Sequence, residues 1–307
     1  NNIEKINWKT GEVESGYKVN NWLQYTNNSS KTIVDPFLGN LNGKGYVIYG
    51  MYFNNLDSKA NVGLIPYQHN NYTASVMNLG IENAYISTGG NASALFALAE
   101  GDEKKIENCY VGENVTLIGN SAGSAIAYGQ KFSIDMFYSL AEVCGDEFYG
   151  LVGDTWSSPM QLDNAYIVGS PITSKKSNPL VCSEVYAEDI LGGTGAVARE
   201  TKSMKGLDVL TNSDKMADLD SCDAFVATEE YPVLAVFTDE GIKEREPEGN
   251  IWSGRVAKKI EEGDGTKENP FVIKNGAELA RAIKKNGFDG SYFVLNNDIY
   301  LNDVSDV

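Results

Sequence analysis

The sequence predicts an all-β fold, a parallel β-helix solenoid with a small α/β capping segment, and three observations lead to this prediction. A five-residue pattern recurs four times, at intervals of 25, 28 and 28 residues. A second series of short, Gly-flanked apolar segments alternates with it. The composition includes 31 Gly and 17 Tyr, which is typical of many short strands joined by tight turns. Repeats of about 20–50 residues indicate units that bury their apolar faces against their neighbours.

The recurring pattern is an aliphatic residue, an acid, usually Asn, a small or apolar residue, and Tyr. Its copies begin at Ile81, Ile106, Ile134 and Leu162 and end at Tyr85, Tyr110, Tyr138 and Tyr166. Stacked strands lie about 4.8 Å apart, so we expect one aliphatic and one aromatic ladder from these residues. The central residues of the copies are Asn83, Asn108, Met136 and Asn164. Asn tolerates left-handed backbone angles, so we expect turns there and a different turn at Met136.

The second series consists of residues 62–67, 94–98, 123–128 and 149–153, and an earlier unit is visible at 37–53. Two strand signals per period, separated by Gly/Asn/Asp-rich turns, indicate one coil of a parallel β-helix. Hairpins would show loops of about two to five residues with Asn-Gly-type turns. After residue 172 the pattern loosens, and we expect a short helix at 208–220 and a closing strand at 231–237.

The chain divides into a β-helix body (1–238), a charged linker (239–250) and a different C-terminal unit (251–307). In this unit we expect a strand at 271–273, an amphipathic helix at 275–285 and a strand pair at 292–301. Asp298, which lies within that pair, is expected to be a turn or capping residue.

Residues 263–287 (GDGTKENPFVIKNGAELARAIKKNG) and 290–303 (GSYFVLNNDIYLND) carry a resemblance. They resemble the opening of bacterial surface proteins built on right-handed parallel β-helices, the pectin-lyase-like, GLUG-repeat-containing secreted proteins. Residues 37–50 resemble the coil that follows in those proteins, and the resemblance covers most of 34–307. It implies a right-handed helix, a bacterial source, and a secreted or cell-surface location.

The order of the segments departs from that family, because the capping unit follows the body instead of preceding it. The chain is then a slice of a tandem array, or a subunit whose cap completes the first coil of the next copy, or a body onto which its own cap folds back. A coil without a cap exposes unpaired strand edges, and strands donated by a neighbour would build a head-to-tail fibre. The residues expected at this interface are Trp8, Phe37, Trp252, Phe271, Ile273, Phe293, Leu295, Ile299 and Leu301.

Charge and composition argue against several other classes of function. The net charge of −17 argues against nucleic-acid binding, and no run of about 20 apolar residues predicts a membrane span. The four cysteines have no C-x-x-C spacing, so we expect small buried residues rather than zinc ligands, with disulfides as the alternative. No cofactor or metal is expected.

No convincing catalytic constellation is present in the sequence. The densest acidic group (Asp214, Asp218, Asp220 and Asp223) is interpreted as solvated surface, or else a weak cation site. The GNSAG segment at 119–123 lacks the strand–turn–helix context and triad partners of a hydrolase elbow. His69 has no second His with which to build a charge relay. Trp156 is the best candidate for a glycan contact.

We therefore expect an extracellular structural or adhesive repeat protein that assembles with copies of itself or with tandem modules. The alternative is a carbohydrate-binding module of a secreted protein, with glycans or a host surface as partner. A polysaccharide lyase or hydrolase is the third hypothesis.

Overall fold

The computed structural model describes residues 5–26, 35–68, 73–100, 104–156, 160–174, 178, 180–238, 251–284 and 287–305, apart from the side chains of Asp220 and Cys222. The expected linker at 239–250 and His69 lie outside these residues. Among the described residues, strands account for 46% and helices for 8%, so this part of the protein is mostly β.

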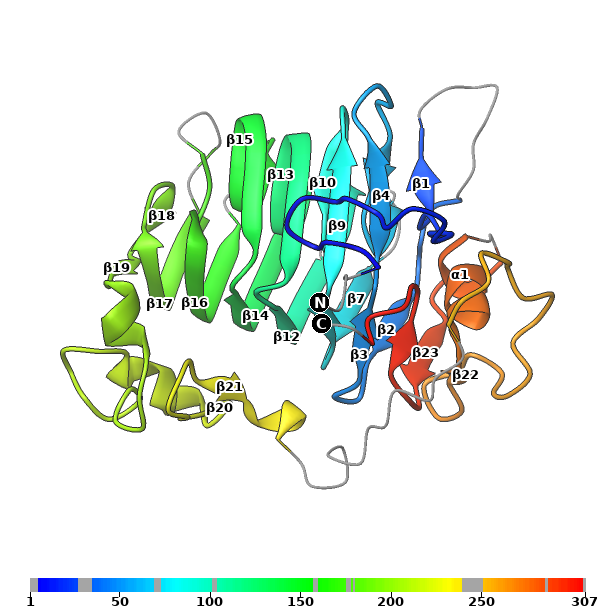
Figure 1. The fold of residues 1–307 in the computed structure, drawn as a ribbon. Helices are drawn as coiled ribbons and strands as arrows, with labels where there is room; N and C mark the ends of the chain where they lie inside the picture. Colours follow the sequence, from blue (N-terminus) through cyan, green and yellow to red (C-terminus); the bar gives the residue numbers. More distant parts are fainter. Residues whose placement is uncertain are drawn as a thin grey trace.

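Within the described residues, most strands belong to two large sheets (Figure 1). The nine-stranded sheet contains β1 (Gln24–Tyr25), β4 (Tyr52–Asn55), β5 (Asn61–Val62), β6 (Ile65–Gln68), β9 (Ala84–Thr88), β10 (Asn91–Ser93), β11 (Phe96–Ala99), β13 (Val115–Gly129) and β15 (Glu142–Thr155). The 13-stranded sheet contains β2 (Asn40–Asn42), β3 (Val47–Tyr49), β7 (Ala74–Met77), β8 (Gly80–Glu82), β12 (Lys104–Val111), β14 (Phe132–Ser139), β16 (Gln161–Pro171), β17 (Leu180–Asp189), β18 (Gly193–Thr194), β19 (Val197–Ala198), β22 (Phe271–Ile273), β23 (Tyr292–Leu295) and β24 (Ile299–Tyr300).

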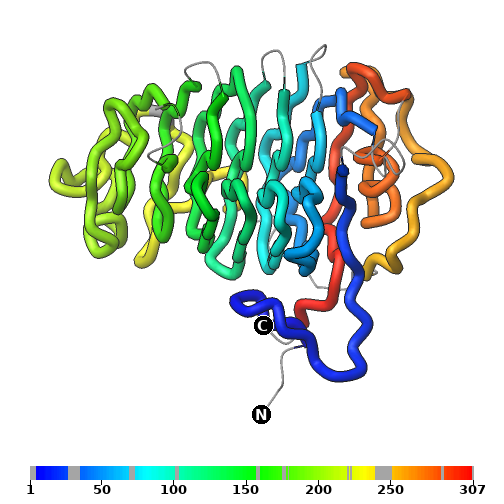
Figure 2. The backbone as a smooth tube through the Cα atoms, turned by 90° about the horizontal axis from the view of Figure 1, so that it is seen from above, coloured from blue at the N-terminus to red at the C-terminus, as the bar shows by residue number. Residues whose placement is uncertain are grey.

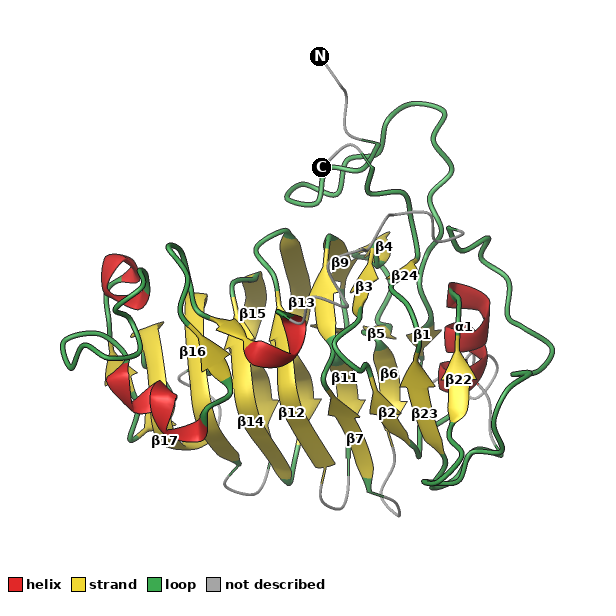
Figure 3. Cartoon of the chain, turned by 90° about the horizontal axis from the view of Figure 1, so that it is seen from below, coloured by secondary structure: helices red, strands yellow, loops and turns green. Residues whose placement is uncertain are grey.

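The remaining elements are short. β20 (Phe225–Val226) and β21 (Val233–Leu234) form an antiparallel pair. The α-helix is α1 (Gly276–Lys284), and the 3₁₀-helices are η1 (Thr201–Met204), η2 (Ala217–Cys222) and η3 (Ala235–Phe237). Figure 3 shows how few helices accompany the sheets.

Neighbouring strands in both large sheets pair in parallel, except that β1 is antiparallel to β5. In the 13-stranded sheet Ile106, Ile134 and Leu162 lie opposite one another, and all three are fully buried. In the nine-stranded sheet Phe96 and Ile126 are also register partners and fully buried. Figure 2 shows the successive turns of the backbone stacked in one row. Both ladders contribute to the same hydrophobic core, so each strand pair buries apolar surface between repeats.

The expected ladders are correct for three copies of the pattern and wrong for the first. Val76, not Ile81, lies opposite Ile106, and Gly80, not Tyr85, lies opposite Tyr110. Residues 76–80 therefore take the structural position of the first copy of the pattern, although their residue types do not match it. A Cβ atom on Gly80 would lie 2.3 Å from the Tyr110 ring, so glycine leaves room for that ring.

The residues named in the first copy belong to other strand pairs. Ile81 lies opposite Ile48 and Val111, and Tyr85 lies opposite Tyr52 in β4, with ring centroids 6.0 Å apart. Two left-handed residues, Asn78 (φ 52°) and Asn83 (φ 50°), bend the chain within seven residues. This second bend moves Tyr85 into the nine-stranded sheet.

The different turn expected at Met136 is wrong. Met136 has φ 49°, against 55° for Asn108 and 48° for Asn164. Glu184 of β17 also has a left-handed φ of 55°. The bend is therefore imposed by the parallel neighbours, and it persists where the residue is not Asn. Asn contributes side-chain bonds instead, as between Asn108 Nδ2 and Asn78 Oδ1 (2.7 Å).

Residues 200–238, the returning segment, run back along the stacked tyrosines. The ring centroids of Tyr110 and Tyr138 are 4.9 Å apart, and those of Tyr138 and Tyr166 are 5.1 Å apart. The returning segment contacts this stack at Tyr231, which lies against Tyr166, and at Phe237, whose ring meets Tyr110 edge-on at 4.7 Å. The segment thus covers the aromatic ladder and brings the chain back toward the first strands (Figure 1).

Two expectations for this segment are corrected. No α-helix forms at 208–220, where turns precede the 3₁₀-helix η2. The closing strand at 231–237 shortens to β21 and continues as η3. Residues 231–237 pack on the stacked tyrosines instead of extending one of the two large sheets.

The C-terminal cap, residues 251–305, packs onto the first strands of its own chain. In β23, Phe293 lies opposite Leu41, and in β24, Ile299 lies opposite Ile48, both in parallel. The strands expected at 271–273 and 292–301 are present as β22, β23 and β24, and the expected helix is α1. In the described residues, the cap therefore pairs with the body of its own chain.

Candidate functional site

Two rows of outward side chains lie together on the nine-stranded sheet, where β6, β11, β13 and β15 run in parallel. Leu98 lies opposite both Tyr67 and Tyr128, and Tyr128 lies opposite Asp154. The four residues come from four successive strands, so they form one row across the sheet. This confirms that the second series of the sequence consists of stacked parallel strands.

The second row follows from the alternation of side chains along a strand. Gln68, Ala99, Gly129 and Thr155 come next after the first row, and all four are buried. The residues after three of them, Glu100, Gln130 and Trp156, therefore return to the outer side. Their backbone N–H groups continue the parallel ladder, donating to the carbonyls of Gln68, Ala99 and Gly129 respectively.

Trp156 is the most exposed aromatic side chain in this part of the protein, with 62% of its surface accessible. Exposing a large aromatic ring to water is unfavourable, and such rings commonly contact ligands. We call the surface formed by the two rows and by Tyr25 the Trp156 face. Its residues are Tyr25, Tyr67, Leu98, Glu100, Tyr128, Gln130, Asp154 and Trp156.

The tyrosines of the Trp156 face lie close to its carboxylates. Tyr25 stacks on Tyr67, with ring centroids 4.1 Å apart and planes 12° from parallel. The pKa of each of these two tyrosines is raised, first by burial and then by the Glu100 carboxylate. The pKa of Tyr128 is raised by burial, then by Asp154 and by Glu100. Glu100 therefore lies near three phenol groups, which keeps them protonated and able to donate hydrogen bonds.

Asp154 also occupies a poorly solvated position. Burial raises the pKa of its carboxyl group, and the backbone N–H of Thr155 opposes this effect by hydrogen bonding. A partly buried carboxylate beside aromatic rings is suited to accepting hydrogen bonds from a ligand that displaces the remaining water.

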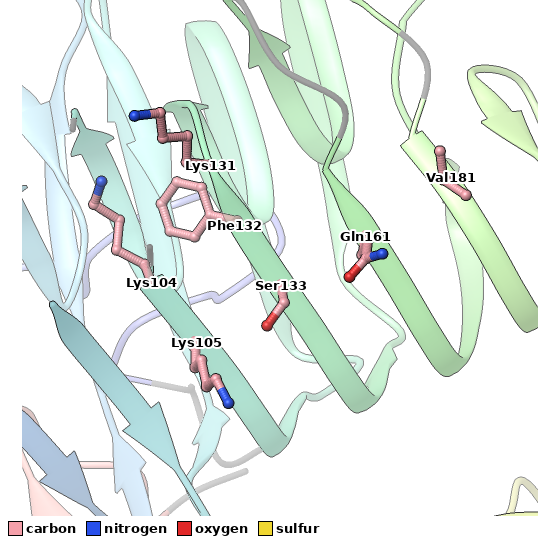
Figure 4. A pocket seen from close by; sticks show the side chains of 7 residues that line it. All are labelled: Lys104, Lys105, Lys131, Phe132, Ser133, Gln161 and Val181. Atoms are coloured by element: carbon pink, nitrogen blue, oxygen red, sulfur yellow. The ribbon is translucent and has the colours of Figure 1, made fainter. Parts of the chain in front are cut away.

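A groove of about 520 Å³ lies on the neighbouring sheet, around the corner at residues 130–132. Figure 4 shows its side chains, with Lys104, Lys131 and Phe132 at one end and Val181 at the other. We call it the lysine groove; its lining residues are Lys104, Lys105, Lys131, Phe132, Ser133, Gln161 and Val181. The Lys104 ammonium lies 5.3 Å from the centre of the Phe132 ring. The groove gathers positive charge on a chain with a net charge of −17.

The residues expected at a cap interface are mostly buried inside the chain. Trp252 meets Trp22 edge-on at 5.1 Å, and Phe293 lies between Phe37 and Phe271, at 6.0 and 5.6 Å. Ile273, Phe293, Leu295, Ile299 and Leu301 are buried to 1% exposure or less. Asp298 accepts a 2.7 Å hydrogen bond from the backbone of Val47 in β3. These residues join the cap to its own body.

Trp8 lies in the N-terminal segment, away from the cap core. It is buried at 3% exposure in a small cluster with Ile6, Tyr52 and Tyr85, against which Val304 packs. It therefore joins the N-terminal segment to the body and to the last described residues of the chain.

The described residues bring no catalytic set together. Ser121 of the GNSAG segment lies within β13, is 2% exposed, and donates its hydroxyl to the Ala127 carbonyl. In the acidic group, Asp218 accepts a 3.0 Å bond from the Tyr186 hydroxyl. Among the residues that the structure describes, no three His, Cys, Asp or Glu side chains are placed to hold a metal ion.

The cysteines depart from the expectation in one case. Cys109 and Cys182 are buried, as expected of small apolar residues, whereas Cys144 is exposed on β15. All three are free thiols.

The sequence analysis named Trp156 as a candidate glycan contact and named none of the other residues of the Trp156 face. The alternation along each strand could have revealed three of them. The residues two places after the outward positions Leu98, Tyr128 and Asp154 are Glu100, Gln130 and Trp156. Comparison of the chain with protein-family models, with curated proteins and with solved structures gives no match. In the described part of the chain, no helix has the length and apolarity needed to cross a bilayer.

Proposed function

We propose that this chain is an adhesive module of an extracellular bacterial protein, built as a right-handed parallel β-helix, that binds glycans on the Trp156 face. The register of β12, β14, β16 and β17 supports stacked coils, because each strand pairs in parallel with its equivalent in the next repeat. The resemblance of residues 263–303 to bacterial surface proteins supports the handedness and the location.

One observation carries the binding function: the exposed Trp156 ring lies in register with Glu100 and Gln130 and beside the row that contains Tyr128 and Asp154. Aromatic rings stack on the apolar faces of sugars, and carboxylates, amides and phenols bind sugar hydroxyls. Strand pairing fixes all of these positions, so the face is preorganised. The repeats supply a rigid surface, and this surface performs binding without a catalyst.

A glycan array that includes neutral glucans, xylans, mannans and amino-sugar oligomers tests the proposal. The intact chain should bind at least one class, and Trp156→Ala should weaken that binding about tenfold, while Trp156→Tyr keeps most of it. Leu207→Ala is the matched control, because Leu207 is 69% exposed and lies on the returning segment. Binding that survives Trp156→Ala unchanged would remove the proposal's main support.

Head-to-tail assembly is the second candidate, favoured by the way in which the cap is attached. β23 and β24 join the body by parallel pairing with β2 and β3. The same pairing between two copies would bury the same surface, and the 239–250 segment connects the cap to the body. Exchange of the cap would therefore extend a fibre without requiring any new contact.

A disulfide lock tests cap exchange. Asn40 and Tyr292 are register partners on β2 and β23, and adjacent strands are close enough for a disulfide. The Asn40→Cys, Tyr292→Cys double variant, made without Cys144, should stay monomeric when oxidised and form concentration-dependent oligomers when reduced. Light scattering that shows only monomers in both states would contradict assembly by cap exchange.

A further inference from the structure

The charges of the Trp156 face restrict the kind of glycan that it accepts. Its charged side chains are Glu100 and Asp154, both carboxylates. Glu100 directly follows β11, and Asp154 lies on β15. The two positions are two strands apart across the sheet and two residues apart along it, which corresponds to about 12 Å. Tyr128, on the strand between them, is close enough to both for each to raise its pKa. The face therefore carries two separate negative charges with a phenol between them.

Burial makes the charge of Asp154 costly, because a half-buried carboxylate loses part of its hydration. A positively charged group on the ligand would offset that cost through a charge-assisted hydrogen bond. The rings of Tyr128 and Trp156 also attract cations, since the face of an aromatic ring is electronegative. The net charge of −17 adds a long-range attraction for cationic molecules.

Three described lysines, Lys104, Lys105 and Lys131, line the lysine groove. Lys104 and Lys105 begin β12, and Lys131 directly precedes β14, both strands of the other sheet. Among the described residues, no lysine or arginine contributes to the pKa shifts of Tyr25, Tyr67, Tyr128 or Asp154. Among the described groups, the charges that act on the tyrosines of this face are therefore the two carboxylates.

We infer that the Trp156 face binds oligosaccharides of amino sugars with free ammonium groups, in preference to the same oligomers in N-acetylated form. This inference rests on the proposed glycan-binding function and adds the chemical class of the ligand. The ammonium groups bind Glu100 and Asp154, and the sugar rings stack on Tyr128 and Trp156.

Titration calorimetry with glucosamine oligomers and N-acetylglucosamine oligomers of equal length tests this inference. The buffer is held near pH 6, below the pKa of about 7.7–8.0 of an ordinary α-amino group, so that the amines are protonated. The glucosamine oligomer should bind at least tenfold more tightly than its N-acetylated counterpart. Added salt should weaken its binding, as expected for charge pairs at a surface.

Carboxylate variants locate the effect. Glu100→Gln and Asp154→Asn should each weaken binding of the glucosamine oligomer about tenfold, the usual scale of one charge-assisted bond. Binding of the N-acetylated oligomer should change little. Asp146→Asn is the matched control, because Asp146 is exposed on the same strand as Asp154 but outside the face. Unchanged thermal unfolding of each variant shows that the fold is intact.

The possible failures are distinguishable. Equal binding of the two oligomers, unaffected by Glu100→Gln but weakened by Trp156→Ala, would overturn this inference and leave the glycan-binding proposal in place. Absence of binding to the glucosamine oligomer would also overturn the inference. If no array glycan depends on Trp156, both proposals are wrong.

Discussion

The Tyr166 hydroxyl donates a 2.6 Å hydrogen bond to the Pro232 carbonyl, so the buried end of the aromatic ladder is joined to the returning segment. Tyr166 is fully buried, and its ring also lies 6.1 Å from that of Tyr231. The bond fixes the position of the returning segment on the stack, because a carbonyl left without a partner in this apolar layer would be costly.

Tyr166→Phe should therefore lower the free energy of unfolding by about 1–2 kcal/mol, the cost of leaving a buried carbonyl without its donor. Tyr138→Phe is the control, because Tyr138 stacks in the same ladder at 5.1 Å from Tyr166 and none of its described contacts is a hydrogen bond to the returning segment. Urea unfolding at equilibrium measures both variants. Equal effects of the two substitutions would show that the bond to Pro232 contributes nothing specific.

Glu82 should make stability depend on pH. The pKa of its carboxyl group is raised from 4.5 to about 7. Burial is the main cause, a hydrogen bond with Tyr110 opposes the rise, and the Glu113 carboxylate adds to it. The native state therefore holds a proton that the unfolded chain releases. Stability attributable to Glu82 is present at and below pH 4.5 and is lost as the pH rises to about 7, by an amount on the order of 1–3 kcal/mol.

Glu82→Gln isolates this effect, since Gln fills the same space without a charge. The variant should gain stability relative to the wild type at about pH 8 and little at about pH 4.5. Denaturant unfolding across this range gives both curves. Parallel curves for the two proteins would mean that Glu82 titrates normally.

Gly80 should not tolerate even a methyl group. A Cβ atom there would lie 2.3 Å from the Tyr110 ring, and forced repacking of a filled core typically costs about 1–3 kcal/mol. Tyr110→Leu opens space next to this position, so Gly80→Ala should cost at least about 1 kcal/mol less in that background. Thermal unfolding of the four proteins in this cycle measures the coupling. Additive effects would contradict the proposed contact.

The Gly80–Tyr110 contact also explains why the sequence misplaces the first repeat. The five-residue pattern was defined by residue types, and the residues from Ile81 to Tyr85 fit those types better than the residues from Val76 to Gly80. The structural requirement is different: a left-handed residue at Asn78, opposite the bend at Asn108, and space for a ring at residue 80. A single sequence reveals the repeat itself, but the register depends on cross-strand contacts that no local pattern contains.

The bend at Met136 also shows that a local residue preference does not determine a conformation that neighbouring strands impose. Sequence preference favours Asn for a left-handed angle, yet parallel neighbours on both sides hold Met136 at φ 49°.

The cap was easier to predict, because the amphipathic spacing of Leu279, Ala280 and Ile283 and the apolar strand at 292–295 are local signals. Trp156 was identifiable as a single aromatic residue, whereas its partners Tyr67 and Glu100 become neighbours only through strand stacking.

The two described ends of the chain lie close together, and this closeness supports a prediction about chain order. Lys5 forms an ion pair with Asp303, and Asn20 donates its backbone N–H to Asn302 Oδ1 at 2.8 Å. Figure 2 shows the dark-blue N-terminal segment beside the red C-terminal segment. The cap is joined to the body by strand pairs and by these contacts. Its attachment therefore does not depend on the covalent link through 239–250.

A circular permutant tests this independence. Residue 305 is joined to residue 5 by a short Gly/Ser linker, and the chain is opened within 239–250, which places the cap before the body. This permutant should fold with a melting temperature within a few degrees of the original chain, because all described strand pairs are kept. The control carries the same linker but is opened at Gly112–Glu113, between β12 and β13. It should unfold at a distinctly lower temperature, since its break frees the ends of β12 and β13, two strands with parallel neighbours on both sides. If the first permutant fails to fold and the control folds, the link at 239–250 is essential and the strand pairs alone do not hold the cap.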